Sequence, residues 1–515
     1  MANGSLSPAE VAEATLITFL ILIPYLLMAP VSVSDRAETS QSPAELLHLA
    51  LSAMGGEDKI RSLKAVHFEA SMVRNMLEQS ERPEGPYIVE NDQVEEWRDL
   101  ENHAWKQIAK LHVAMQPEFV MTAVVSDGIA ARSFNGQPIP GSGEQVQDAG
   151  EALALSPERV LITALDSSDL HRLPDLTMQG VPHQLVEFTW QASPVRIYLN
   201  GDTHLPTAVE WVAAYPYGIF WSIWGDVTTR IYYSLWWLQN GIHYPLQADV
   251  VRNGLPDRTV TVVKLDFNPS IEGDAFRIPA ETRTAFLGVE KRTIDDRAPS
   301  ATTNELAPGI IFIPGAWNTT IVRQDDGLVI LEAPMSSGYS AKVIQMAEQK
   351  FPGIGIKAVI TTSDSWPHIG GLREYVARGV PVYVLDRTVP LIERFLHSPR
   401  TRYPDSLART RRDAEFRPVS SKTWIGTGPN RIAIYPIHGE TSERQMMVYF
   451  PQHKLLYGSD PFQQLEDGKF FYPQTVFELQ NAVEREHLTV ERFFMMHIGP
   501  TPWSKVLETV ADAQR

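Results

Sequence analysis

The sequence has no cysteine among its 515 residues. Disulfide bonds, thiolate catalysis and cysteine-ligated zinc or iron–sulfur sites are therefore excluded. Positive charge is also scarce, because 45 Lys and Arg stand against 62 Asp and Glu, for a formal net charge of -17. Such an acidic chain is a poor default partner for nucleic acid, and we expect no nucleic-acid ligand. With 43% hydrophobic residues, the chain is long enough to bury several cores.

Charged residues are absent from residues 14–33, which read ATLITFLILIPYLLMAPVSV. About 20 apolar residues suffice for a helix to cross the ~30 Å hydrocarbon core of a membrane. No basic residue precedes Arg36, which argues against a cleaved signal peptide, whereas Pro24 would kink an anchor helix. We expect residues 1–34 to be an anchor or signal helix, with a buried soluble helix as a third interpretation. Either of the first two predicts a cell-envelope protein, membrane-anchored or exported to the periplasm or beyond.

A polar linker, residues 35–43, separates this segment from a helical pattern of leucines. The pattern then changes to short alternating runs, which continue to about residue 279. Turn pairs such as Asn240-Gly241 and Asn253-Gly254 separate these runs. Alternation broken by Asn-Gly pairs is typical of antiparallel strands joined by hairpins. We therefore predict an antiparallel domain over residues 44–281.

Charged, aperiodic residues 282–305 predict a second linker. Beyond it, strand-like runs alternate with helical patterns to the end of the chain. This rhythm predicts a mixed domain over residues 306–515, so the fold class of the whole chain is α+β.

Residues 306–515 resemble the metallo-β-lactamase fold superfamily at five places in the same order. The matching stretches are DGLVILEAP at 326–334, a strand at 351–360, HIGGLR at 368–373, MVYFP to LLYGSD at 447–460, and MHIG at 496–499. The resemblance implies a sandwich of two sheets between two layers of helices, αββα. It also implies that loops at one end of the sheets carry metal ligands.

The metal motif departs from the family pattern. The family signature is T-H-x-H-x-D-H-x-G-G, but Ser363, Ser365 and Pro367 stand at the first two histidine positions and at the aspartate position. Only His368 is retained. Asp460 and His497 match the last two ligand positions. A further ligand, the histidine of a Gly-His-Thr turn, falls near Glu440, with His438 just upstream as a weak alternative.

These losses decide what chemistry the domain can support. A serine hydroxyl is a weak neutral ligand, so the first of the two metal sites is predicted to be lost. The second keeps His368, Asp460 and His497, and two histidines with one carboxylate can hold a single zinc, iron or manganese ion. We expect one such ion or none. Asp364 lies near these positions but is expected to face elsewhere.

The antiparallel domain carries its own signal, a density of Trp and Tyr over residues 211–244. Core packing explains it, and so does a groove for a lipid or other hydrophobic ligand. Residues 241–279 resemble the end of the half-barrels of periplasmic lipoprotein carriers, and residues 46–63 fit the opening of that pattern. The resemblance implies an envelope setting and a hydrophobic ligand.

The leading hypothesis is an envelope protein whose degenerate metal centre makes it a non-catalytic binding, scaffold or accessory subunit of a membrane assembly, with a protein partner. A single-metal hydrolase of the metallo-β-lactamase superfamily is the first alternative. A carrier that uses the half-barrel is the second. No catalytic residue is assigned from the sequence.

Overall fold

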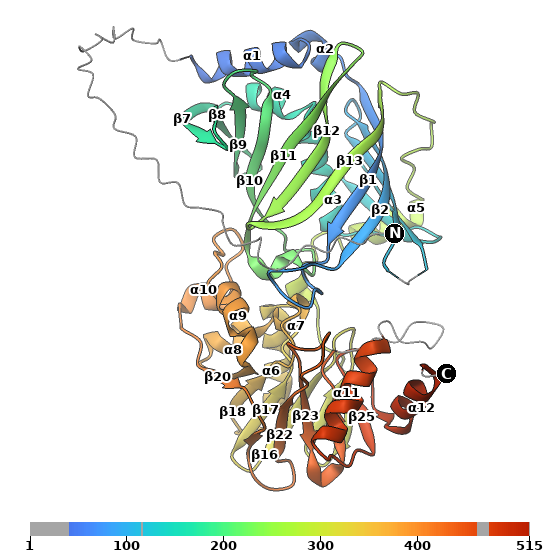
Figure 1. Cartoon of the computed structure of the whole chain (residues 1–515), viewed down its shortest axis with the longest axis vertical. Helices are drawn as coiled ribbons and strands as arrows, with labels where there is room; N and C mark the ends of the chain where they lie inside the picture. The colour runs from blue at the N-terminus through green and yellow to red at the C-terminus, as the bar shows by residue number, and fades with distance from the viewer. Residues whose placement is uncertain (1–40, 115–116, 461–472, 514–515) are drawn as a thin grey trace, which may run out of the picture. The chain divides into compact units, whose positions relative to one another are not determined.

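The computed structural model describes residues 41–114, 117–460 and 473–513 (Figure 1). The predicted anchor or signal helix, residues 1–34, lies outside the described residues, as does nearly all of the linker at 35–43. In the part of the chain that the structure describes, every helix is too short or too polar to cross a membrane. Residues 42–515 form one compact unit.

The first described helix begins with a capping box, in which side chains of the first turn form hydrogen bonds with its free backbone amides. The hydroxyl of Ser42 accepts a hydrogen bond from the Glu45 amide at 3.2 Å, and the Glu45 carboxylate accepts one from the Ser42 amide at 2.7 Å. Pro43 takes the first helical position, where no amide donor is needed. Gly55, with φ of 124°, ends α1 (Pro43–Met54), and the short α2 (Glu57–Arg61) follows. The leucines of the predicted helical pattern, Leu46 to Leu51, all lie in α1.

A large antiparallel sheet follows, with 13 strands among the described residues. The strands are β1 (Ala65–Asn75), β2 (Val89–Asp99), β3 (Ala104–Leu111), β4 (Phe119–Ser126), β5 (Ile129–Phe134), β6 (Ile139–Pro140), β7 (His171–Met178), β8 (Val181–Trp190), β9 (Ser193–Asn200), β10 (Pro206–Ala214), β11 (Asp226–Gln239), β12 (Ile242–Arg252) and β13 (Leu255–Phe267). Their order is β6-β5-β4-β3-β2-β1-β13-β12-β11-β10-β9-β8-β7, so the first and last strands pair at the centre.

The hairpin turns explain why this sheet forms. Asn240 and Gly241 both have positive φ, 53° and 75°, and so do Asn253 and Gly254, 48° and 79°. Two successive residues of positive φ make the tight turn whose twist matches paired antiparallel strands. The predicted antiparallel region is thus confirmed. Its likeness to lipoprotein-carrier half-barrels stays a prediction.

Helices cover parts of this sheet. They are α3 (Gly143–Ala154), α4 (Val160–Leu165) and α5 (Ala280–Leu287), with short 3-10 turns at Trp221–Trp224 and Ile294–Asp296. Leu47 and Leu51 of α1 and Leu161 of α4 share one buried cluster with Phe188 and Val209 of the sheet. The predicted linker at 282–305 contains most of α5 and the second of these 3-10 turns.

Two more sheets make up the rest of the described chain. The first is β14 (Asn304–Ala307), β15 (Ile310–Ile313), β16 (Thr319–Gln324), β17 (Gly327–Leu331), β18 (Ile356–Ile360), β19 (Val382–Leu385) and β20 (Phe416–Val419), in that order. The second is β21 (Thr423–Ile425), β22 (Ile432–Pro436), β23 (Met446–Phe450), β24 (Leu455–Tyr457), β25 (Arg492–Phe494) and β26 (Thr501–Pro502). Strands β17 to β20 run parallel to one another.

The helices of this region are α6 (Ser337–Lys350), α7 (Trp366–Ile369), α8 (Leu372–Ala377), α9 (Val389–Leu396), α10 (Ser406–Thr410), α11 (Pro473–Arg485) and α12 (Ser504–Ala513), with 3-10 turns at Asp386–Thr388 and Pro451–His453. Successive strand side chains point to opposite faces. Ile432 and Ile434 accordingly pack between the two sheets, while Ala433 and Tyr435 pack against α11 and α12.

The first sheet is covered in the same way on its outer face. Val343 of α6, Tyr375 of α8 and Phe395 of α9 share a buried cluster with Ile330 and Val359 of the sheet. The layers are therefore helix, sheet, sheet, helix, as predicted (Figure 1). Both faces of each sheet are buried, which explains why its strands read as continuous apolar runs.

The aromatic stretch 211–244 belongs to the core only in part, since five of its eleven aromatic residues are buried. Trp211, Trp224 and Tyr244 are buried, whereas Trp237 is 57% exposed. Trp224 lies edge-on to Trp366 of α7, with ring centroids 5.1 Å apart. This contact ties the antiparallel region to the helix that carries His368.

Candidate functional site

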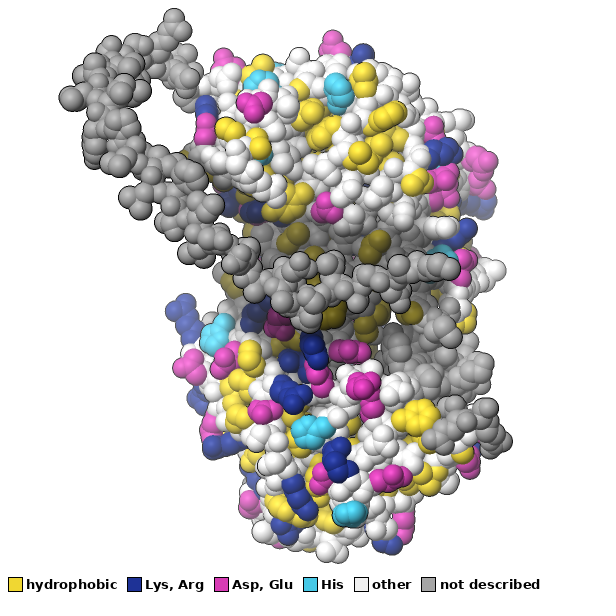
Figure 2. Space-filling model, viewed as in Figure 1, with side chains coloured by type: hydrophobic (Ala, Val, Ile, Leu, Met, Phe, Trp, Pro, Cys, Tyr) yellow, Lys and Arg dark blue, Asp and Glu magenta, His cyan; other side chains and the backbone are white. Residues whose placement is uncertain are grey.

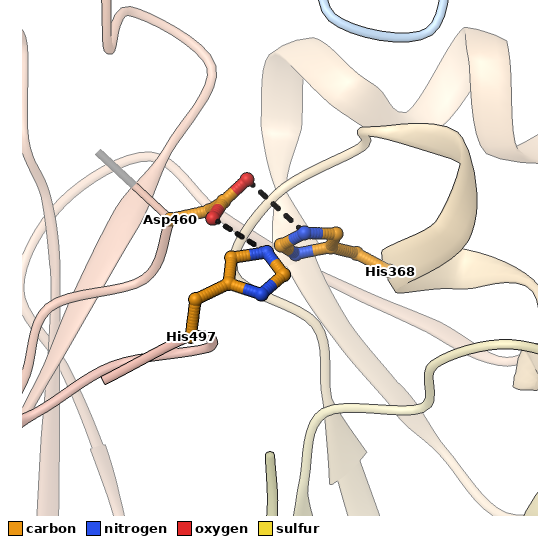
Figure 3. A group of neighbouring side chains, drawn as sticks. All are labelled: His368, Asp460 and His497. Atoms are coloured by element: carbon orange, nitrogen blue, oxygen red, sulfur yellow. Dashed lines mark ion pairs between the residues drawn. The ribbon is translucent and has the colours of Figure 1, made fainter. Parts of the chain in front are cut away.

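Three predicted side chains meet at one end of the two small sheets (Figure 3). His368 lies in α7, Asp460 follows β24, and His497 follows β25. Their ligand-type atoms all lie within 4.8 Å of one another. His368 Nε2 is 3.1 Å from Asp460 Oδ2, and His497 Nε2 is 3.2 Å from Asp460 Oδ1. We call these three residues the His–Asp–His cluster.

A hydrogen bond on the side away from Asp460 fixes the orientation of the His497 ring. Its Nδ1 lies 2.7 Å from the carbonyl oxygen of Ala316. A carbonyl can only accept, so Nδ1 carries the proton and donates it. Nε2 is then the nitrogen that faces Asp460, and in the neutral ring it presents a lone pair. Histidines that bind metals are usually held in this way.

His368 has fewer hydrogen-bond partners than His497. Its side chain is 2% exposed, and Nδ1 has no hydrogen-bond partner among the described residues. Asp460 Oδ1 is also buried and lacks a hydrogen bond of good geometry to the described part of the chain, although His497 Nε2 is near. Buried polar atoms left without partners are costly. A shared cation would satisfy the orphaned carboxylate oxygen.

Charge within the cluster shifts its pKa values in opposite directions. Burial opposes ionisation of Asp460, but the imidazoles of His368 and His497 outweigh it and hold the pKa of Asp460 well below its usual range. Burial would lower the pKa of His497, but Asp460 and the Ala316 carbonyl raise it. The site therefore favours a carboxylate anion facing positive charge.

A buried acid anchors the loop that leads to His368. Glu332 follows β17 and is fully buried. It accepts hydrogen bonds from the Thr362 amide at 3.2 Å and from the Thr362 hydroxyl. That hydroxyl also lies 2.7 Å from the hydroxyl of Ser459, next to Asp460. Burial raises the pKa of Glu332. This network joins the His368 loop to the Asp460 loop.

The positions that differ from the family motif make contacts of their own. Ser363 accepts a hydrogen bond from the Ser365 amide at 3.2 Å, and the Ser365 hydroxyl donates to the carbonyl of Glu78 at 3.0 Å. The carbonyl of Pro367 accepts from the Met335 amide at 2.7 Å. All three positions therefore serve the packing of the loop.

Asp364 lies outside the His–Asp–His cluster and is paired with Arg444. The guanidinium of Arg444 binds it through Nε at 2.8 Å and through Nη2. Burial raises the pKa of Asp364 and Arg444 opposes this rise. A second metal ion in this region would have to compete with that ion pair.

The two weaker sequence candidates lie outside the His–Asp–His cluster. His438 and Glu440 are exposed in the loop after β22. The sequence analysis missed the residue that shapes this loop, Glu478 of α11. Its carboxylate accepts hydrogen bonds from the amides of Thr441, at 3.0 Å, and Ser442, at 2.9 Å. The sequence offered no signal for this contact, which joins segments 36 residues apart or more.

A cleft of about 170 Å³ opens beside the cluster. One wall is the His368 loop with Arg444 and Asp460, and the other is the connection between β1 and β2, residues 76–88. We call this connection the wall segment. Arg82 in it binds Glu443 at 2.6 and 3.1 Å, and Leu77 packs into the core of the small-sheet region. The antiparallel region thus supplies one wall of the cleft, a contact between distant segments that no sequence pattern indicated.

A second histidine–carboxylate group lies on the large sheet. His67 faces Glu95 at 3.0 Å and Asp266 at 3.3 Å, and Lys264 binds Glu69 at 3.0 Å. Both ring nitrogens of His67 already face carboxylates, and a lysine neutralises part of the charge. This group is a surface ion-pair network.

No protein-family model and no curated protein matches the chain. Among solved structures, it is similar to the DIM-1 metallo-beta-lactamase, with 14% identity over 42% of this chain and 98% of that one and a TM-score of 0.33. A metallo-beta-lactamase from Pontibacter korlensis gives 14% identity over 42% and 99%, with a TM-score of 0.33. The sec-alkylsulfatase Pisa1 from Pseudomonas sp. gives 16% over 41% and 40%, with a TM-score of 0.31. Likeness this slight carries no conclusion about activity.

Proposed function

We propose that residues 306–515 form a metallo-β-lactamase-like domain that binds one divalent metal ion at His368, Asp460 and His497 and acts as a hydrolase on a small substrate in the adjoining cleft. The convergence of these three side chains from separate loops carries the proposal. Two imidazoles and one carboxylate are a donor set that zinc, iron or manganese accepts with positions left open.

The donor set fits one ion and does not fit two. Ser363 and Ser365 stand at ligand positions of the other site, and Pro367 stands at the aspartate position of the retained site. All three contribute hydrogen bonds that hold the loop instead. Asp364 is neutralised by Arg444. When bound, a single ion supplies Lewis acidity and lowers the pKa of a water molecule in the site.

The chain's own residues prepare the site for this ion. The Ala316 carbonyl fixes the proton of His497 on Nδ1, so that Nε2 is free to act as a ligand. Asp460 is held as an anion, which offsets the charge of a cation. Leu77, Ile88 and Trp366 line the cleft and keep part of it dry. The open remainder is where a substrate would bind.

Metal content of the full chain tests the proposal. The protein is loaded separately with zinc, iron(II) and manganese, dialysed, and measured by elemental mass spectrometry. We expect one ion per chain of at least one metal. His368→Ala and His497→Ala are expected to lower metal affinity by at least ~100-fold, since each removes a ligand. His438→Ala, a histidine outside the cluster, is the matched control and is expected to bind as the wild type does.

Wild type without metal, or His497→Ala with undiminished metal, would overturn the single-ion site. Hydrolysis of a panel of carboxylate, sulfate and phosphate esters then tests the catalytic half. Loss of activity in His497→Ala but not in His438→Ala supports a hydrolase.

A second candidate function uses the same site without catalysis. The hydrogen bonds of Ser363 and Ser365 favour this non-catalytic function, because they stabilise the loop without a metal ion. The domain would then be a binding or accessory module with a protein partner. A metal-loaded protein that hydrolyses nothing in the panel would favour this candidate.

The envelope location is a proposal that rests on residues 14–33, outside the described residues. Cell fractionation tests it directly. The full chain is expected in the membrane or exported fraction, and a chain starting at residue 35 is expected to leave it. Equal distribution of the two would contradict the proposal.

A further inference from the structure

A second cavity, of about 350 Å³, lies inside the antiparallel region between α3 and the large sheet. It is separate from the metal cleft and shares no lining residue with it. Its walls are rich in aromatic side chains, namely Trp105, Trp211, Tyr215, Trp221, Tyr233 and Tyr244. A cavity of this size and composition suits a small organic ligand. We call it the sheet cavity.

One face of α3 lines the sheet cavity with three acids, Glu144, Asp148 and Glu151. Their spacing, four and then three residues, places them on one side of a helix. Glu151 accepts hydrogen bonds from Gln147 at 3.1 Å and Tyr215 at 3.2 Å. The carboxylates of Glu144 and Asp148 have no hydrogen bond or ion pair with any side chain in the described part of the chain.

The ion pairs of the arginines that line the sheet cavity are formed with other acids. Arg98 pairs with Glu96 at 2.7 Å and with Glu158 at 3.0 Å. Arg74 pairs with Glu90 at 2.7 Å. Each of these guanidinium groups already has at least one carboxylate partner.

The remaining two arginines share a single acid. Asp257 lies 2.5 Å from Arg258 and 3.9 Å from Arg252. The positive charge of Arg252 lowers the pKa of each of the three α3 acids, although it forms an ion pair with none of them. Its guanidinium stands over the rings of Tyr215, at 5.0 Å, and Trp221, at 5.3 Å. The carboxylates of Glu144 and Asp148 are therefore left without an ion pair to any described residue in the sheet cavity. The contacts of Arg252 also show that its aromatic wall accepts a cation.

Unpartnered polar groups in the same walls point independently to a ligand. Trp105 is 4% exposed, and its indole N–H has no acceptor in the described residues. Ser156 is 5% exposed, and its hydroxyl likewise has no partner there. Both side chains line the sheet cavity. A ligand with a hydroxyl or carbonyl oxygen would satisfy them, since the indole can only donate.

We infer that the sheet cavity binds a small organic cation, an ammonium group on a compact body that carries a hydroxyl or carbonyl oxygen. Asp148 and Glu144 face the positive charge, the aromatic wall packs against the body, and Trp105 donates to the oxygen. This ligand differs from the acyl chain that a lipoprotein-carrier likeness implies, because an acyl chain would leave the carboxylates buried and unpaired.

Binding of two matched probes tests the inference. Choline and its uncharged isostere 3,3-dimethylbutan-1-ol have the same shape and hydroxyl and differ in one charge. Titration calorimetry on the full chain measures both, and quenching of tryptophan fluorescence reports occupancy, because three tryptophans line the cavity. We expect choline to bind at least ~10-fold more tightly than the isostere. Asp148→Asn is expected to remove that preference.

Glu101→Gln is the matched control. This carboxylate is exposed beside Lys64, outside the sheet cavity, and its loss is expected to leave choline binding unchanged. The thermal midpoint of each variant verifies folding, and Glu144→Gln gives a second, independent removal of charge. Equal affinity for both probes, tighter binding of octanoate, or undiminished choline binding in both Asp148→Asn and Glu144→Gln would overturn the inference. None of these readouts depends on the metal site.

Discussion

The cleft beside the His–Asp–His cluster and the sheet cavity both contain acids shielded from solvent, but these acids have different partners in the two places. In the cleft, Asp460 lies between two imidazoles and Asp364 is bound by Arg444. In the sheet cavity, Asp148 has no such partner among the described residues. The pKa of Asp460 is accordingly held low, while burial and the neighbouring charges of Glu144 and Glu151 raise the pKa of Asp148 to about 7. Surroundings rather than residue type decide which acid is ionised at neutral pH.

The two sites also differ in what their acids can do. Partnered acids in the cleft hold loops in place and present a ready set of ligand atoms. An unpartnered acid costs folding energy, so it is expected where a ligand later supplies the missing charge. Three substitutions test whether the two sites differ in this way.

The largest effect is expected from removing the partner of a cleft acid. Arg444→Met leaves Asp364 buried and unpaired, and breaking a buried pair on one side costs about 3–5 kcal/mol. The free energy of unfolding, measured by denaturant titration, is expected to fall by about 3 kcal/mol.

The double variant Asp364→Asn, Arg444→Met serves as the control. It removes the buried charge together with its partner, so it is expected to recover most of the lost stability. If single and double variants are equally unstable, packing by the Arg444 side chain matters more than its charge.

An intermediate effect is expected from neutralising the cavity acid. Because folding raises the pKa of Asp148 from 3.8 to about 7, its contribution to stability is full below about pH 4 and is lost as the pH rises through 7. Asp148→Asn avoids this loss. The variant is expected to be more stable than wild type at pH 8 by about 2 kcal/mol, with partial exposure allowed for, and to show no such advantage at pH 4.

Unfolding titrations of both proteins at the two pH values measure this difference. An advantage that is the same at both pH values would mean that the gain comes from packing and not from charge.

The smallest effect is expected from removing one hydrogen bond between uncharged groups. Its donor, Ser365, stands at a histidine position of the metallo-β-lactamase motif. Ser365→Ala removes the hydrogen bond to the carbonyl of Glu78, which joins the His368 loop to the wall segment. A typical bond of this kind contributes about 1 kcal/mol. Hydrogen exchange at residues 76–88 is expected to speed up while metal content stays the same. Lost metal in this variant would show that the wall segment also positions the His–Asp–His cluster.

Sequence patterns predicted the parts of the structure that depend on local periodicity. Asn-Gly turns marked the hairpins, and apolar runs marked the strands of the two small sheets. His368, Asp460 and His497 were singled out by their order along the chain, and the structure brings them together. Contacts between distant segments were not predictable in this way. Arg444 reaches Asp364 across 80 residues, and Ser365 reaches Glu78 across 287.

The three acids of α3 were not predicted as site residues for a different reason. Their spacing was visible in the sequence, but on a helix it is equally typical of a solvent-exposed face. Only the position of α3 against β2 to β5 shows that this face lines a cavity. His438 and Glu440 illustrate the reverse case, since a local match to a ligand turn did not bring them to the cluster.

The wall segment has a practical consequence for how this protein is studied. A fragment that begins at residue 306 would keep the His–Asp–His cluster but would lack Leu77, Glu78 and Ile88, which close one side of the cleft. Such a truncation would open the binding site to solvent and admit bulkier molecules. Substrate screens on the fragment would then report a selectivity that the intact chain does not have.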